Sequence, residues 1–289
     1  MANLLDNVRW KRFWIPRETQ PQLDGRGYFA DPEAEYGKLH NPKAKTLEEL
    51  DDRPCLALLG EPGIGKSHVV DEYRKGATAR AGEGAVLYVD FRWPRDLNRA
   101  IFATSQFERW RKGEAALWLV LDSLDEYREG PAEAAAQIIG ELQGGPVGSL
   151  RLRIACRTAE WPGVLDEQLP RLWRRTEEEA QQDEEPVAFY ALAPLRRVDV
   201  AAAAKEDAAG FLEEVARRDA EPLAIKPITL RFLLEEYRRN QRLPPTRVEL
   251  YEKGCTILCE EGSRSREAPG AREHCAPSSA WPSRHGSLP

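Results

Sequence analysis

The stretch Cys55-Leu-Ala-Leu-Leu-Gly-Glu-Pro-Gly-Ile-Gly-Lys-Ser67 decides the fold of this 289-residue chain. Five apolar residues, 55–59, run into a glycine-rich turn, and a helical pattern begins at Lys66. Glycines let such a turn wrap with its amides pointing inward, and the helix N-terminus adds a positive dipole. This order of strand, glycine-rich turn and helix predicts a cradle for phosphate groups.

The turn matches G-x-x-x-x-G-K-[ST], the pattern of a P-loop. We expect Lys66 to reach the β and γ oxygens of a nucleoside triphosphate, and Ser67 to bind Mg²⁺. The ligand is therefore ATP or GTP with Mg²⁺, and nothing in the sequence selects the base. The candidate nucleotide-binding residues are Gly60, Glu61, Pro62, Gly63, Ile64, Gly65, Lys66, Ser67 and the following His68.

A second apolar run, 117–121, leads directly into Asp122, Asp125 and Glu126. A buried strand that ends in carboxylates is typical of a cation site, so we assign Asp122 to Mg²⁺ together with Ser67. Asp125 or Glu126 would orient or deprotonate the attacking water.

A third apolar strand, 150–156, ends at Arg157. An arginine at the same edge of the sheet would sense the γ-phosphate and stabilise the charge of the transition state. The candidate catalytic residues are thus Asp125, Glu126 and Arg157.

Short apolar runs alternate with helical patterns through the middle of the chain, which predicts an α/β fold with a parallel sheet between helices. The expected strands are 55–59, 85–91, 116–121, 150–156 and 186–192, and the expected helices follow residues 66 and 131 and occupy 95–112. After Pro194 the pattern becomes helical at 197–208, 209–219, 226–240 and 246–261. The last helix is expected to face the core through Val248, Tyr251, Cys255 and Leu258.

The chain therefore divides into four expected parts: an irregular aromatic-rich segment (1–46), a P-loop NTPase domain (47–193), a small all-helical lid (194–261) and a tail (262–289). The basic and aromatic run from Arg9 to Trp14 is expected to dock within the molecule rather than stack on nucleic acid. The tail is rich in Ser, Pro, Gly, Arg and Ala, which fits either a disordered tail or an out-of-frame, non-native continuation.

Composition narrows the classes of partner. The net charge of −6 and pI near 5.5 disfavour a protein that coats nucleic acid, because counterion release needs excess positive charge. No apolar run approaches the ~20 residues that span a bilayer, and residues 1–12 lack the apolar core of a secretory signal. We expect a cytoplasmic protein with no membrane partner. Five cysteines, two of them in apolar runs, predict no disulfide framework.

These pieces together resemble the NACHT branch of the STAND class of signalling P-loop ATPases. The resemblance covers the loop at 60–67, the acids at 122–126, Arg157, the segment from Lys226-Pro227 to Leu234, and Leu243 to Glu252. It implies that Pro227 contacts the nucleotide. It also implies a switch in antiphage defence, with slow ATP hydrolysis, nucleotide-dependent self-association, and a protein trigger and effector that the sequence does not identify.

The resemblance ends near residue 261, so the chain is similar to a bacterial NACHT protein truncated after its first helical subdomain. Two rivals remain open at this point. One is an energy-coupled ring ATPase of the AAA+ kind. The other is a non-hydrolysing nucleotide-binding scaffold or a truncated remnant.

Overall fold

The computed structural model describes residues 8, 10–173, 185–246, 248–254 and 256. The expected tail and positions Cys255 and Leu258 of the expected last helix lie outside the described residues.

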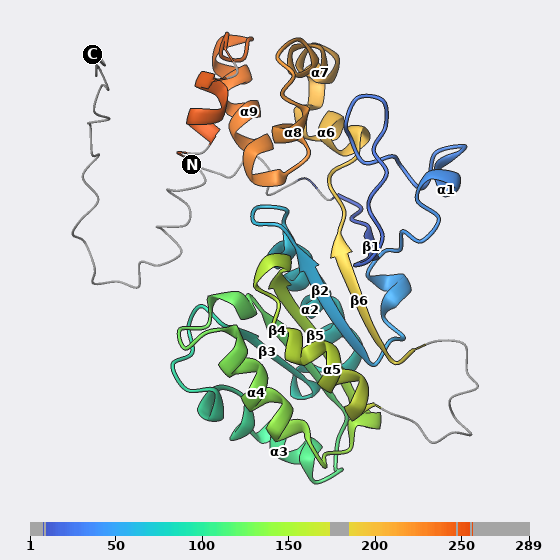
Figure 1. Cartoon of the computed structure of the whole chain (residues 1–289), viewed down its shortest axis with the longest axis vertical. Coiled ribbons are helices and arrows are strands. Elements are labelled where there is room, and N and C mark those ends of the chain that lie inside the picture. Colours follow the sequence, from blue (N-terminus) through green and yellow to red (C-terminus); the bar gives the residue numbers. More distant parts are fainter. Residues whose placement is uncertain (1–7, 9, 174–184, 247, 255, 257–289) are drawn as a thin grey trace, which may run out of the picture.

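The core is an α/β fold built on a six-stranded sheet in the order β1-β6-β2-β5-β4-β3 (Figure 1). The five strands from β2 to β6 are parallel, and β1 pairs with β6 in the antiparallel sense. The strands are β1 (Trp14–Pro16), β2 (Cys55–Gly60), β3 (Val86–Asp90), β4 (Leu117–Asp122), β5 (Leu150–Arg157) and β6 (Val187–Leu192). The five strands expected from the sequence are confirmed.

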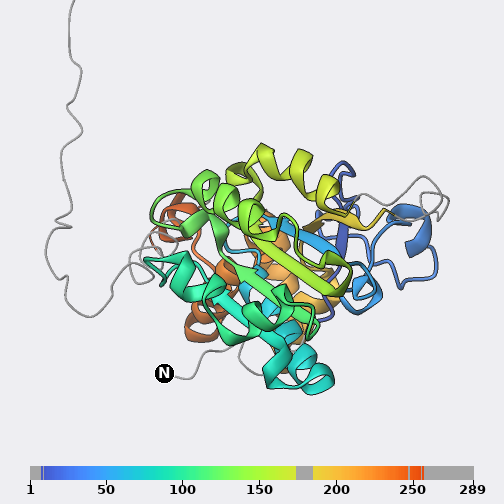
Figure 2. The ribbon, with the colours of Figure 1, turned by 90° about the horizontal axis from the view of Figure 1, so that it is seen from below.

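Helices cover both faces of the sheet, which explains why its central strands are apolar along their whole length. On one face, α3 (Ser105–Arg111), α4 (Pro131–Leu142) and α5 (Gly163–Leu172) share a core with alternate strand residues. On the other face, α2 (Lys66–Ala81) packs through Val70, Tyr73 and Ala77. Figure 2, at right angles to Figure 1, shows α4 and α5 together on one side of the sheet.

A helical lid lies beyond the carboxyl ends of the parallel strands (Figure 1). It has its own apolar core, formed by residues such as Phe211, Leu230 and Leu233, which are fully buried. Its helices are α6 (Arg197–Ala204), α7 (Ala208–Arg217), α8 (Glu221–Ala224) and α9 (Pro227–Asn240), followed by helical residues at 248–254 and 256. The short α8 was not expected from the sequence.

The last helical segment corrects one sequence prediction. Val248, expected to face the core, is 65% exposed, whereas Leu250 is buried. The prediction is wrong for Val248 and holds for Tyr251, which packs against the lid core together with Leu250.

The N-terminal segment is more ordered than its irregular composition indicated. Trp14 pairs with Leu192 at the edge of the sheet, and its side chain is fully buried against residues of β2 and α2. The segment also contains α1 (Gly37–His40) and a capping box in which Thr46 and Glu49 exchange hydrogen bonds. The expected docking of the aromatic run within the molecule is confirmed for Phe13 and Trp14.

No helix among the described residues has the length and apolar character needed to cross a membrane.

Replacing Trp14 by Ala tests whether this edge strand belongs to the core. We expect a loss of about 3–5 kcal/mol in the free energy of unfolding, because a buried Trp leaves a large cavity. Urea unfolding of the purified chain measures the change. The matched control is Trp93→Ala, whose side chain is 60% exposed and should change stability by less than about 0.5 kcal/mol. Equal effects of the two variants would contradict a structural role for β1.

Candidate functional site

The P-loop occupies the turn between β2 and α2, where its glycines allow a backbone that other residues rarely adopt. Gly63 has φ +72° and Gly65 has φ +96°, both in the left-handed region. Gly65 is the N-cap of α2 and has no side chain to accept hydrogen bonds from the first turn. The amides at this helix N-terminus are therefore left for an acceptor from outside, as a phosphate-binding turn requires.

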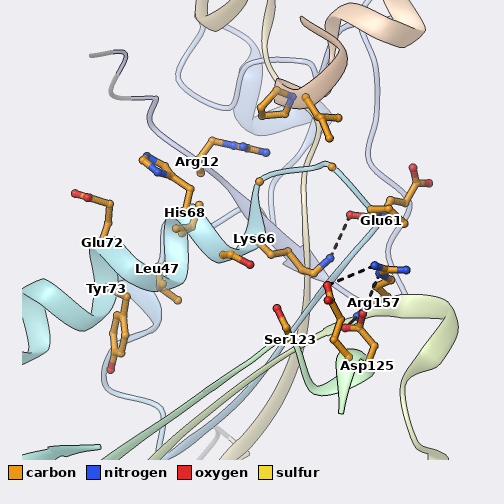
Figure 3. A pocket seen from close by; sticks show the side chains of 18 of the residues that line it. Arg12, Leu47, Glu61, Lys66, His68, Glu72, Tyr73, Ser123, Asp125 and Arg157 are labelled. Carbon is orange, nitrogen blue, oxygen red and sulfur yellow. Dashed lines mark hydrogen bonds and ion pairs between the residues drawn. The ribbon is translucent and has the colours of Figure 1, made fainter. Parts of the chain in front are cut away.

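Lys66 folds back over the loop that carries it (Figure 3). Its Nζ donates to the carbonyl oxygens of Gly60, at 2.6 Å, and Glu61, at 3.2 Å. Burial lowers the pKa of Lys66, while the nearby Asp125 acts in the opposite direction. A partly desolvated ammonium held by two carbonyls is suited to exchange them for phosphate oxygens.

Ser67, in the first turn of α2, lies beside Asp122, the last residue of β4, although β4 is not a neighbour of β2 in the sheet. The hydroxyl of Ser67 is 3.3 Å from Oδ1 of Asp122, and the hydroxyl of Tyr88 is 3.4 Å from Oδ2. Asp122 is 1% exposed, and burial raises its pKa, a shift that the hydrogen bond from Ser67 partly opposes. A hydroxyl beside a carboxylate is the hard-oxygen donor set that Mg²⁺ prefers, so these two residues fit the metal.

The acids that follow Asp122 have different surroundings. Ser123 adopts φ +58°, and the chain then makes a 3₁₀ turn over Leu124–Glu126. Asp125 is held by Arg157 at both oxygens: the backbone N–H donates to Oδ1 at 2.9 Å and Nε lies 2.9 Å from Oδ2. Glu126 is more exposed, and its Oε1 lies 3.6 Å from Nη2 of Arg157. Asp125 is thus a brace for Arg157, and Glu126 is freer to act on a substrate.

The lid touches the loop at its exposed crest. A Cβ on Gly63 would lie 2.3 Å from Cγ2 of Ile228, so this contact requires glycine. Pro227, the first residue of α9, lies close to Gly65, and Lys226 forms an ion pair with Glu61. The sequence-predicted Pro227 is therefore at the loop.

A cleft with a volume of about 1810 Å³ runs between the loop, the lid and the N-terminal segment. This exceeds the ~300–1000 Å³ typical of small-molecule sites, so a nucleotide fits. The sequence-predicted residues that line it are Glu61, Pro62, Gly63, Gly65, Lys66, Ser67, His68, Asp125, Glu126, Arg157 and Pro227. Gly60, Ile64 and Asp122 do not line it, since they are buried beneath the loop.

Sequence reasoning missed three residues at this site. Tyr88 contacts Asp122 from β3, Lys226 contacts the loop from the lid, and Arg12 reaches the loop from the N-terminal segment. Arg12 belongs to the basic and aromatic run noted in the sequence, but no spacing rule connects residue 12 to a loop some fifty positions away.

Comparisons with known proteins find only distant structural similarity. No family model matches the chain, and no curated protein does. Among solved structures, it is similar to the Walker-type ATPase PABY2304 of Pyrococcus abyssi, with 17% identity and a TM-score of 0.42 over 86% of this chain and 79% of that one. It is also similar to Cdc6p of Pyrobaculum aerophilum, with 15% identity and a TM-score of 0.37 over 65% of this chain and 57% of that one. The similarity to domain III of DnaA from Thermotoga maritima has 14% identity and a TM-score of 0.37 over 74% of this chain and 86% of that one.

Asp122→Asn tests the electrostatics of the buried carboxylate. Burial raises the folded-state pKa of Asp122, so the ionised carboxylate at neutral pH costs stability that an amide of similar size would not. We expect the melting temperature of the nucleotide-free protein to rise by about 2–4 °C, as measured by differential scanning calorimetry. Ser67→Ala is the control, and it should lower or leave the melting temperature. A fall with Asp122→Asn would mean that the carboxylate is stabilised by its hydrogen bonds.

Proposed function

We propose that this chain binds a magnesium nucleoside triphosphate in the cleft and hydrolyses it slowly, with ATP as the first candidate and GTP as the second. The observation that carries the proposal is that Lys66, Ser67, Glu126 and Arg157 line one cleft beneath the lid, with Asp122 directly behind Ser67. These are the parts that phosphoryl transfer needs: a phosphate cradle, a metal site, a group that acts on water and a cation.

In this proposal the amides of the loop and Lys66 hold the phosphates, while Ser67 and Asp122 hold Mg²⁺. The metal, when bound, neutralises charge on the phosphate oxygens. Glu126 accepts a hydrogen bond from the attacking water, orients it and takes up its proton. Arg157, fixed by Asp125, offsets the charge that develops on the transferring phosphoryl group.

The lid contacts support a switch. Ile228 packs on Gly63 and Lys226 pairs with Glu61, so a change in the shape of the loop on nucleotide exchange would be felt directly by α9. This agrees with the resemblance to NACHT-type STAND proteins, from which the proposed role in cytoplasmic defence signalling follows. Self-association and the protein trigger and effector are part of the same proposal.

Two other functions make different use of the same site. A ring ATPase of the AAA+ kind would need an arginine from a second copy, and its turnover would rise with a polymer substrate. A non-hydrolysing scaffold or a remnant would bind nucleotide without turnover. Hydrolysis assays on the chain with site variants separate these cases.

Lys66→Ala tests nucleotide binding. We expect calorimetric titration to show binding of Mg·ATP and Mg·ADP to the wild-type protein and at least a hundredfold weaker binding to the variant, since the lost ion pairs with phosphate are worth about 3 kcal/mol. The matched control is Lys75→Ala on the same helix, where Lys75 pairs with Asp71 and Glu72 and does not line the cleft. Equal affinities in all three proteins would overturn the proposed site.

Glu126→Gln tests hydrolysis. We expect the rate of phosphate release to fall by about 10²- to 10⁴-fold with the affinity for ATP retained, because the amide cannot accept the proton. Asp125→Asn should also slow turnover, through loss of the brace on Arg157. Glu129→Gln serves as the control, since Glu129 is exposed and does not line the cleft. If Glu126→Gln and Asp125→Asn both hydrolyse at the wild-type rate, the scaffold is the better description.

A further inference from the structure

Arg12 connects three parts of the molecule through one side chain. Its Nη1 donates to the carbonyl oxygen of Ile64 in the P-loop at 3.0 Å, and its Nη2 donates to that of Ala193 at 2.8 Å. Ala193 directly follows β6, on the path into the lid. The guanidinium therefore ties the loop to the junction between the sheet and the lid, although Arg12 itself precedes the edge strand β1.

The charge of this guanidinium is not balanced by a partner in the described part of the chain. No carboxylate there forms an ion pair with Arg12. The two charges that act on it most, Asp199 and Arg196, have opposite signs, and Asp199 is already bound by Arg196 through two hydrogen bonds of 2.9 Å. Burial lowers the pKa of Arg12 to about 10. Burying a cation whose partners are carbonyl oxygens alone costs desolvation free energy, and a bound anion would offset that cost.

Two other buried arginines differ from Arg12 because each forms an ion pair with a carboxylate. Arg196 binds Asp31 and Asp199, and the fully buried Arg153 donates to several backbone carbonyls and pairs with Asp51. Arg153 lies outside the cleft, whereas Arg12 lines it. Of these three guanidinium groups, the one without a carboxylate partner is the one that lines the cleft.

The place of Arg12 in the cleft identifies the kind of anion. Its Nη1 lies 3.1 Å from the position that a Cβ on Gly65 would take, so it stands at the N-terminus of α2. Lys66 reaches toward Gly60 and Glu61 at the other end of the loop (Figure 3). Of the five N–H groups of a guanidinium, two bind the carbonyls, which leaves three for a ligand.

We propose that Arg12 is a second cation of the phosphate site, which binds an oxygen of the nucleotide phosphate nearest to the N-terminus of α2. This inference rests on the proposed nucleotide binding and extends it to a residue outside the P-loop. Because the same guanidinium holds Ile64 and Ala193, the bound phosphate would tighten the link between the loop and the lid junction.

The test compares Arg12→Lys, which keeps the charge, with Arg12→Gln, which keeps an N–H donor and loses the charge. Calorimetric titration of Mg·ADP and Mg·ATP into each protein measures affinity at two salt concentrations. We expect Arg12→Gln to bind both nucleotides about tenfold more weakly or worse, with Arg12→Lys in between. We also expect the salt dependence of binding to decrease in Arg12→Gln and to persist in Arg12→Lys, which a purely structural role would not produce.

Arg153→Lys is the matched control, since it alters a buried guanidinium bound to backbone carbonyls away from the cleft. It should lower the melting temperature and leave both affinities unchanged. Lys66→Ala, measured alongside, separates the two proposals: if it loses binding while Arg12→Gln binds like the wild type, the inference about Arg12 is overturned and the proposed function stands. Equal weakening by Arg12→Gln and Arg12→Lys, with unchanged salt dependence, also overturns the inference.

Discussion

The left-handed turn at Gly63 and Gly65 is the constraint on which the rest of the site depends. It reverses the chain between a fully buried strand and a helix within a few residues, so the first amides of α2 face the cleft rather than the core. The same turn has no Cβ at its crest, and this gives Ile228 of the lid room to settle on it. A side chain at Gly63 would therefore disturb the phosphate cradle and the contact with the lid together.

The parallel sheet explains how distant residues reach this turn. All parallel strands end at the same edge, and β5 lies between the strand of the loop and the strand of Asp122. This order sets Gly60 opposite Arg157 in the register of β2 and β5. Arg157 then meets the acids that follow β4, which is why Asp125 is bound at both oxygens while Glu126 is left more open. The sequence alone could not separate these two acids, because their difference arises from the neighbouring strand.

The sequence predicts those features of the fold that depend on neighbouring residues, and it does not predict those that depend on contacts between distant segments. The strands were predictable because both faces of the sheet are covered, so each central strand is a continuous apolar run. The loop and its helix were predictable from the spacing of glycines and Lys66. The edge strand β1 was not, because three residues that pair with β6 show no periodicity. Arg12 and Lys226 were not, because their contacts with the loop come from chain segments that only the fold brings near.

The buried charges of the cleft connect nucleotide binding to the position of the lid. Burial shifts the pKa of Arg12, Lys66 and Asp122 in the direction that disfavours each charged form. The protein therefore holds desolvated charges of both signs in one place, and the two cations reach backbone carbonyls where a phosphate would serve them better. A magnesium nucleotide supplies the missing charge of each sign, so its binding would relieve these costs and stabilise the folded chain. Because Arg12 and the crest of the loop both contact the elements that lead into the lid, that gain would depend on the position of the lid. A ligand that binds the protein better in one lid position than in another shifts the population between the two positions. In this chain the contacts of Arg12 with Ala193 and of Gly63 with Ile228 would produce that difference in binding.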